Sequence, residues 1–159
     1  MRALIKWFVR TVVVAVVSAL TVFFVGMRMK QPVVTNAVRR FNRDVGNPRQ
    51  MKTAGTPGAY ASIMRHVGRS SGKPYETPIV PVATDDGFVV LLPYGPNVDW
   101  LKNVQAAGTA TLTHEGVTHT VSDPEIVSTA SVAHQLPSNE VRMSKLFAVG
   151  ECVVLRRVS

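Results

Sequence analysis

The side chains best suited to binding an anion lie in one glycine-rich turn, residues 68–72 (GRSSG). Backbone amides and small hydroxyl groups on such a turn can bind phosphate oxygens, and the planar guanidinium of Arg69 adds a fixed cation. Lys73 follows directly, so a polyanionic ligand would meet two positive charges here. The turn therefore predicts a phosphate site, with an ordinary structural role for Arg69 as the alternative interpretation.

A second turn, residues 93–97 (PYGPN), leads into a helix predicted over residues 99–107. Asp99 is expected to cap the start of this helix, and Gly108 is expected to end it. Trp100 either contacts the ring of a ligand or fills the core of the domain, and Tyr94 either lines a site or packs within its own turn. The two turns and this helix are the parts of the chain that could form one binding site.

The remaining polar residues do not have the pattern of a catalytic or metal site. The sequence has no CxxC and no HExxH, and its four histidines lack the spacing of metal ligands. The single cysteine, Cys152, lies in an apolar run and is expected to be a buried structural thiol. The sequence therefore predicts neither a catalytic side chain nor a metal.

Strand patterns dominate the chain after residue 58. Strands are predicted over residues 59–67, 77–83, 88–92, 109–114, 117–121 and 152–158, and helices over 33–42, 99–107, 128–135 and 139–147. Five or six short antiparallel strands usually close into a small barrel, because closure removes exposed edges. A doubly wound nucleotide fold is excluded, since it would need regular strand–helix alternation.

The basic charge of the chain is concentrated before residue 53. Residues 1–52 contain ten lysines and arginines and one acid, whereas residues 53–159 contain eight and nine, which together give the formal net charge of +8. A nucleic-acid-binding domain would usually carry its basic patch on the folded body. Here the basic residues flank an apolar segment, so the predicted partner is an anionic membrane surface and no nucleic acid.

The apolar segment, residues 11–27, has no charge and reaches spanning length with residues 4–8, because Lys6 and Arg10 can snorkel. An uncleaved, single-pass anchor is predicted, with a signal peptide or a helix lying on the membrane as alternatives. Lysines and arginines are denser after the segment than before it. The positive-inside rule then places the C-terminal domain in the cytoplasm, at the cytoplasmic membrane.

Three parts of the chain follow from these patterns. Residues 1–30 form the membrane anchor, and residues 31–54 form a basic helix and linker, with Asn36 and Arg39 of the helix pointing outward. The proline- and glycine-rich residues 47–58 are read as a linker or as a loop that wraps the domain. Residues 55–159 form the folded domain.

Taken together, the turn at residues 68–72 with Pro74, Thr77 and Pro78, the turn after Leu92 and the helix start at residues 99–103 (DWLKN) resemble the deazaflavin-dependent nitroreductase family. The resemblance covers residues 55–158. It implies a mainly β, split β-barrel fold with flanking helices, related to FMN-binding barrels, and the cofactor coenzyme F420. F420 is an 8-hydroxy-5-deazaflavin with a phosphate and an oligoglutamate tail.

The resemblance also implies which positions bind the cofactor. The first turn and the strand after it would contact the phosphate and ring, the second turn would line the ring, and the helix start would complete the site. These residues are Arg69, Ser70, Ser71, Gly72, Tyr75, Glu76, Thr77, Pro78, Ile79, Val80, Leu92, Pro93, Tyr94, Gly95, Asp99, Trp100, Leu101, Lys102 and Asn103. Many members of the family carry lysine in place of Ser70 and tyrosines near the C-terminus, where this chain offers Phe147.

The function predicted from the resemblance and the anchor is a membrane-anchored, F420-dependent oxidoreductase of the quinone reductase or nitroreductase type. Its acceptor would be lipophilic, such as a quinone, because an anchored site meets membrane-dissolved molecules at high effective concentration. Two alternatives stay open: a non-catalytic F420 carrier or binding module, and an FMN-dependent split-barrel reductase. Split barrels often dimerise, so a homodimer is a further expected partner alongside membrane lipid.

Overall fold

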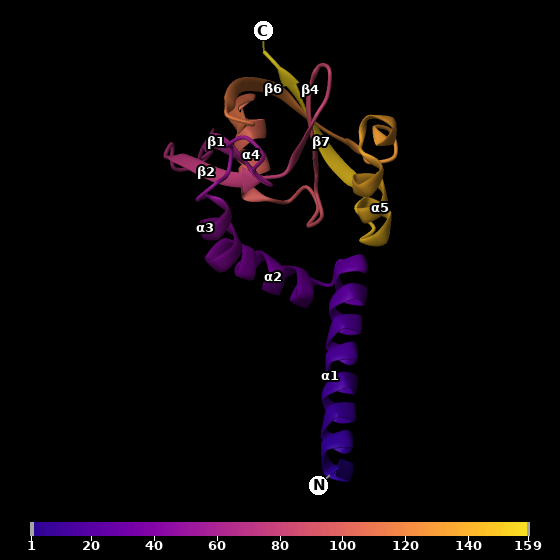
Figure 1. Ribbon diagram of the computed structural model, residues 1–159. Helices are drawn as coiled ribbons and strands as arrows, with labels where there is room; N and C mark the ends of the chain where they lie inside the picture. Colours follow the sequence, from indigo (N-terminus) through magenta and orange to yellow (C-terminus); the bar gives the residue numbers. More distant parts are fainter. Residues whose placement is uncertain (1, 159) are drawn as a thin grey trace.

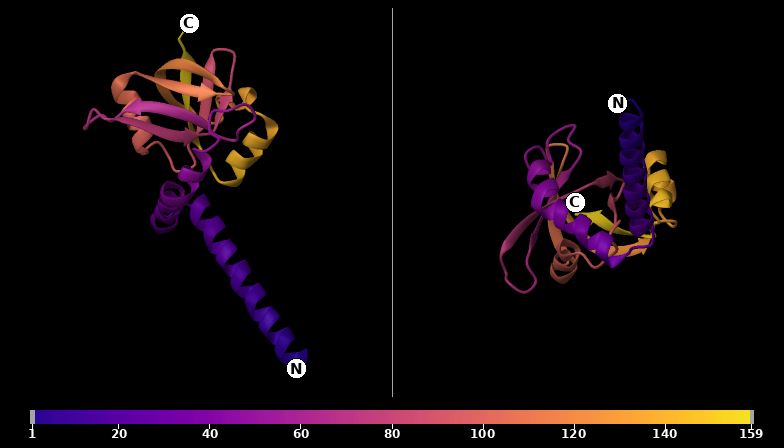
Figure 2. Two further views of the ribbon diagram at one scale, coloured as in Figure 1. Left: turned by 60° about the vertical axis from the view of Figure 1, so that its left-hand side comes forward. Right: turned by 90° about the horizontal axis from the view of Figure 1, so that it is seen from below.

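The computed structural model describes residues 2–158 and contains one seven-stranded sheet in which all paired strands are antiparallel. The strands run in the order β2-β1-β5-β6-β7-β4-β3. Their bounds are β1 Ser62–Val67, β2 Pro74–Ile79, β3 Pro81–Ala83, β4 Gly87–Leu91, β5 Thr109–His114, β6 Val117–Ser128 and β7 Glu151–Arg157. The two edge strands, β2 and β3, are joined through Val80 alone, so the sheet curls back on itself into a half-barrel (Figures 1 and 2).

The interior of the half-barrel is apolar and is closed by helix α4, Asp99–Ala107. Phe88, Leu101, Leu112 and Leu155 are completely buried there. Each of these side chains contributes about 1.5–3 kcal/mol relative to an exposed one, so this core is the main source of stability. Cys152 is also buried, on the other side of the sheet, and burial raises the pKa of its thiol, as expected for a structural cysteine.

Strands β5 and β6 form the hairpin that the sequence predicts, around the two-residue turn Glu115-Gly116. Both turn residues have positive φ, 50° and 80°, which matches the twist of the flanking strands. Strand β6 is longer than predicted and continues to Ser128, with a bulge between Ser122 and Glu125. The bulge bends the strand, which pairs with β5 over Val117–Ser122 and with β7 over Val121–Ser128.

Two predictions of secondary structure are wrong. Residues 77–83 are not one strand, because β2 already begins at Pro74 and the chain bends at Val80 before β3. Residues 128–135 are not a helix: only the 3-10 turn Ala133–Gln135 forms. The Ser128 side chain accepts a hydrogen bond from the Ala130 amide at 3.2 Å, and such local bonding competes with helix formation. The last helix, α5, spans Ser138–Leu146 as expected.

The N-terminal part consists of α1 (Arg2–Arg28), α2 (Pro32–Phe41), a π-helical turn (Asn42–Gly46) and α3 (Asn47–Gln50). Helix α1 projects away from the domain, and α2 leads away from its C-terminal end at an angle toward α3 (Figure 1). Gly26 makes this elbow possible, because a Cβ there would collide with the side chain of Val34. After α3 the chain wraps the domain: the buried Gly55 accepts a hydrogen bond from the Gly116 amide at 2.6 Å.

The end of α1 is fixed to α5. The guanidinium of Arg28 donates to the carbonyls of Lys145 and Leu146 at 2.8 and 2.9 Å. These are carbonyls of the last turn of α5, where a cation is favoured by the helix dipole. The rings of Phe24 and Phe147 pack at a tilt of 53° beside this contact, with 5.5 Å between their centroids. Helix α1 is therefore attached to the domain by specific contacts and not by a flexible linker.

Candidate functional site

The glycine-rich turn at residues 68–72 is bound to the start of α4 through Arg69. The guanidinium of Arg69 donates to Asp99 Oδ1 at 3.0 Å and to Asn103 Oδ1 at 2.9 Å. Its backbone amide also donates to Asn103 Oδ1, at 3.1 Å. Two segments about thirty residues apart in the sequence thus meet at one place. Arg69 has a structural role there, in addition to any role in binding.

Asn103 continues this network into the sheet. Because its oxygen accepts from Arg69, its amide nitrogen donates to Nδ1 of His66, at 3.2 Å. Nε2 of His66 then carries the proton and donates to the hydroxyl of Thr77, at 3.0 Å. His66 is 7% exposed, and burial lowers its pKa, so the ring is neutral. The network links the first turn, α4, β1 and β2.

The outer side of the turn keeps groups that can meet a ligand. The hydroxyl of Ser71 lies 3.3 Å from the phenol of Tyr75, whose ring stacks on His66 at 5.8 Å. Ser70 and Lys73 are exposed, and their side chains have no hydrogen-bond or ion-pair partner among residues 2–158. One hydroxyl and one ammonium group on this turn are therefore available to an anionic ligand.

The second turn is held by α2 and by the π-helical turn that follows it. Arg39 donates to the carbonyl of Tyr94 at 2.6 Å and lies over the Tyr94 ring, 5.9 Å from its centroid. Asn42 donates to the Tyr94 hydroxyl at 2.7 Å. Burial raises the pKa of Tyr94. The expectation that Arg39 points outward is wrong, since the Tyr94 turn offers its side chain a carbonyl and an aromatic face.

Helix α4 ends as predicted but begins differently. Gly108 closes it with φ of 72°, and its amide donates to the Val104 carbonyl. Asp99 is not the N-cap: Val98 occupies that position without a side-chain bond, and Asp99 is the first helical residue. The carboxylate of Asp99 instead pairs with Arg69. At the first turn of α4 this negative charge also interacts favourably with the helix dipole.

The other predicted cofactor residues divide by exposure. The side chains of Ile79, Leu92 and Leu101 belong to the core, so a ligand could reach only their backbone. Trp100 packs partly against the same core, which supports its structural interpretation. Exposed or half-buried side chains remain at Tyr75, Glu76, Thr77, Pro78, Val80, Pro93 and Lys102, while Gly72 is exposed and Gly95 buried. Glu76 is engaged by Arg65, at 2.7 Å.

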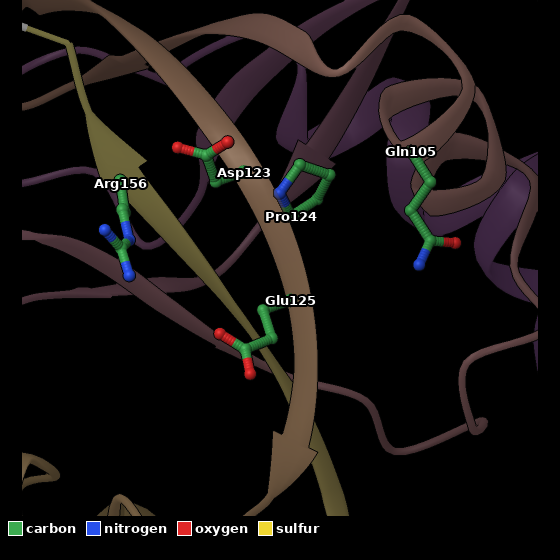
Figure 3. Close-up of a pocket in the computed structure, with 5 residues that line it drawn as sticks. All are labelled: Gln105, Asp123, Pro124, Glu125 and Arg156. Carbon is green, nitrogen blue, oxygen red and sulfur yellow. The ribbon is translucent and has the colours of Figure 1, made fainter.

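Two hollows of the described chain lie away from these residues. One, of about 640 Å³, is lined by Gln105, Asp123, Pro124, Glu125 and Arg156, beside the bulge of β6 (Figure 3). The other, of about 450 Å³, is apolar and lies in the corner between α1 and α2. No predicted cofactor residue lines either hollow.

Sequence reasoning missed His66, Arg39 and Asn42. His66 had a local signal: it alternates with Ser62 and Met64 on the inward face of β1, and a histidine at such a position needs buried partners. Arg39 and Asn42 had none, because their contacts with Tyr94 join residues 55 and 52 positions apart.

Comparison with protein-family models finds no match, and neither does comparison with curated proteins. Among solved structures, the chain is similar to an F420-H2 dependent reductase, with 15% identity and a TM-score of 0.37 over 61% of this chain and 94% of that one. It is similar to an F420 reductase, with 11% identity and a TM-score of 0.42 over 68% and 92%. A third structure, described as a domain-swapped dimer, has 18% identity and a TM-score of 0.33 over 72% and 81%. At these TM-scores the similarity assigns no function to this chain.

Proposed function

We propose that this protein is a membrane-anchored oxidoreductase that uses reduced coenzyme F420 to reduce a lipophilic acceptor such as a quinone; nitroaromatic compounds are further candidate acceptors. The observation that carries the proposal is the bonding of the 68–72 turn to the start of α4 through Arg69, Asp99 and Asn103. The motifs on which the family resemblance rests come from separate parts of the sequence. The meeting of two of these motifs, the 68–72 turn and the start of α4, supports a shared cofactor site there.

The charges around this surface suit the polyanionic tail of F420. Arg69, Lys73 and Lys102 carry three positive charges on the turn and α4, against the carboxylate of Asp99, while the carboxylate of Glu76 on β2 is paired with Arg65. The exposed hydroxyl of Ser70 lies between the first two cations in sequence and can donate to a phosphate oxygen. Charge-assisted bonds from lysine and arginine are about twice as strong as neutral ones, so these residues would supply most of the tail affinity.

The residues around the ring would act by position. F420 supplies the hydride chemistry when bound, so the protein needs no acid–base pair. Tyr94 and Gly95 would line the ring, and Arg39 and Asn42 would hold their turn in place from α2. A rigid turn would help to keep the donor and acceptor carbons about 3–3.5 Å apart, the distance that hydride transfer requires.

The anchor supports the choice of acceptor. Of the helices described, one, Leu4–Arg28, is long and apolar enough to span a bilayer, and none of its apolar window is buried in the protein. This helix is attached to the domain through Arg28 and Phe24. A site held at a fixed place beside the membrane would meet bilayer-dissolved quinones at high effective concentration.

The test uses the full-length chain in lipid nanodiscs. Titration with F420 and with FMN, followed by cofactor fluorescence, should show tighter binding of F420. Stopped-flow mixing with reduced F420 and a short-chain quinone should then show oxidation faster than in empty nanodiscs. Tighter FMN binding would replace the proposal with an FMN reductase. F420 binding without faster oxidation by any quinone or nitro acceptor would replace it with a carrier.

A further inference from the structure

Helix α2 exposes its apolar face. In a helix that packs on a globular domain, the apolar stripe is normally the buried side. In α2, Val33 is 83% exposed, Phe41 is 59% exposed, and Ala37 between them is exposed. These three residues recur at a spacing of four, so they form one continuous stripe along the helix. Nothing else in residues 2–158 covers this stripe.

The side of α2 that faces the domain is polar. Thr35 is buried there, and Arg39 and Asn42 bond to Tyr94 at 2.6 and 2.7 Å. A third side carries Asn36, Arg40 and Arg43, all exposed. The amphipathic character of α2 is thus reversed relative to a helix that packs on a domain. Its polar side chains bind the domain, and its apolar side chains face away from it.

The apolar stripe of α2 joins the apolar surface of α1. Ser18, Ala19, Val22 and Phe23 of α1 and Val33, Val34, Ala37 and Val38 of α2 line the hollow of about 450 Å³ in the corner between the two helices. Its surface is almost entirely apolar. The corner between the two helices opens on the side of α2 away from the sheet (Figure 1). The candidate membrane span and α2 therefore present one continuous apolar surface.

Exposed cations frame this surface at the depth where α1 ends. Lys30 lies in the turn between the helices, and Arg40 lies on the flank of α2. Arg43 follows in the π-helical turn, where its exposed side chain pairs with Asp44 at 2.8 Å. An apolar stripe with basic residues beside it is the pattern of a helix that lies in the interface of an anionic bilayer. A protein partner would not require this cationic frame.

We propose that α2 lies flat in the headgroup layer of an anionic membrane, with lipid acyl chains filling the α1–α2 corner. The stripe of Val33, Ala37 and Phe41 dips into the acyl boundary, and Lys30, Arg40 and Arg43 bind headgroup phosphates. Because the opposite side of α2 holds Tyr94, the membrane sets the position of the second turn of the candidate site. The proposal rests on the anchoring part of the proposed function and is independent of the cofactor.

The test places an environment-sensitive fluorophore on single introduced cysteines in the full-length chain, reconstituted in vesicles containing phosphatidylglycerol. Native Cys152 is completely buried, so the fluorophore should not react with it. Labelling of the unsubstituted chain is the control for this expectation. Phe41→Cys reports the α2 stripe. Val158→Cys is the matched exposed control, because the C-terminus lies at the opposite end of the molecule from α1 (Figure 1).

In vesicles, the probe at residue 41 should emit at a shorter wavelength than the probe at residue 158. Nitroxide-labelled lipids should also quench the probe at residue 41 several-fold more than the probe at residue 158. Removing phosphatidylglycerol, or introducing Arg40→Glu with Arg43→Glu, should reduce the quenching.

Equal exposure of both probes in a chain that resists carbonate extraction would overturn the proposal while leaving the anchor intact. A probe at residue 41 that is shielded but not quenched by lipid would mean a protein covers the stripe, which also overturns it. Extraction of the chain by carbonate would contradict the anchor itself.

Discussion

At the scale of single residues, Arg69 is already paired before any cofactor binds. Its guanidinium bridges Asp99 and Asn103, so it holds the first turn to α4. The pair with Asp99 is solvent-exposed, with the two side chains 37% and 87% exposed, and exposed pairs of this kind contribute at most about 1 kcal/mol. A phosphate could therefore replace the carboxylate as the partner of Arg69 at low cost.

This competition gives a prediction with a built-in control. Arg69→Ala should weaken F420 binding by about 1.5–3 kcal/mol, the range for a bond to a charged group. Asp99→Asn keeps the cation but removes its competitor, so this variant should bind F420 as tightly as the parent chain or more tightly. Fluorescence titration at several salt concentrations measures both. If the two variants lose affinity equally, Arg69 acts only by holding the turn.

His66 predicts a dependence of stability on pH. Burial lowers its pKa in the folded chain below the ordinary value of about 6.5, so the unfolded chain binds a proton first as pH falls. The folded state should keep its full stability above about pH 6.5 and lose stability as pH falls further through the folded pKa. His66→Gln, which retains a donor and an acceptor, should flatten this loss.

The measurement is urea unfolding of the chain in detergent micelles, followed by circular dichroism between pH 7.5 and 5. His119→Gln is the necessary comparison, because burial and the nearby Arg157 also lower the pKa of His119. A pH dependence that is unchanged in His66→Gln would show that the neutral state of His66 does not stabilise the fold.

At the scale of elements, the contact between α1 and α5 carries the clearest prediction. Arg28→Gln should leave the last carbonyls of α5 without their cation, and that turn should open more readily. Hydrogen–deuterium exchange over residues 138–147 should then increase by about an order of magnitude, which corresponds to roughly 1.4 kcal/mol of lost protection. Arg10→Gln, on α1 but far from α5, should change nothing in this segment.

The sheet and α4 were predictable because their signals are local. The hairpin at Glu115 and Gly116 follows from alternation and a two-residue turn, and Gly108 ends α4 by its own backbone preference. The ties that build the candidate site were not predictable in this way. The bonds of Arg69 to Asp99 and of Arg39 to Tyr94 span 30 and 55 positions, and only the folded chain brings these residues together.

At the scale of the whole molecule, the chain exposes two apolar surfaces, α1 and the stripe of α2, and the two proposals predict different membrane affinities for them. Full-length protein should stay in the membrane fraction through a carbonate wash, because α1 is long enough to span the bilayer. A chain lacking residues 2–27 should leave that fraction but still bind vesicles containing phosphatidylglycerol at low salt through α2. Flotation at increasing salt measures this binding, which screening should abolish.

Circular dichroism of the truncated chain must first show the native sheet. A folded, truncated chain that floats with no vesicle at any salt concentration would show that α1 is the sole membrane contact. One that binds neutral and anionic vesicles equally would show that the basic flank of α2 has no part in binding.

The joint between Arg28 and the end of α5 has a consequence for how the chain is made. Its partners are 117 and 118 positions apart, so the ribosome has synthesised almost the entire domain before this joint can close. At about 5–20 residues per second, that interval is on the order of ten seconds. Helix α1 emerges first and can enter the bilayer during that time, so the barrel would be assembled on a membrane-bound nascent chain. If α1 is the proposed anchor, insertion would precede folding, and the final docking of α5 onto α1 would be the step that orients a newly made domain.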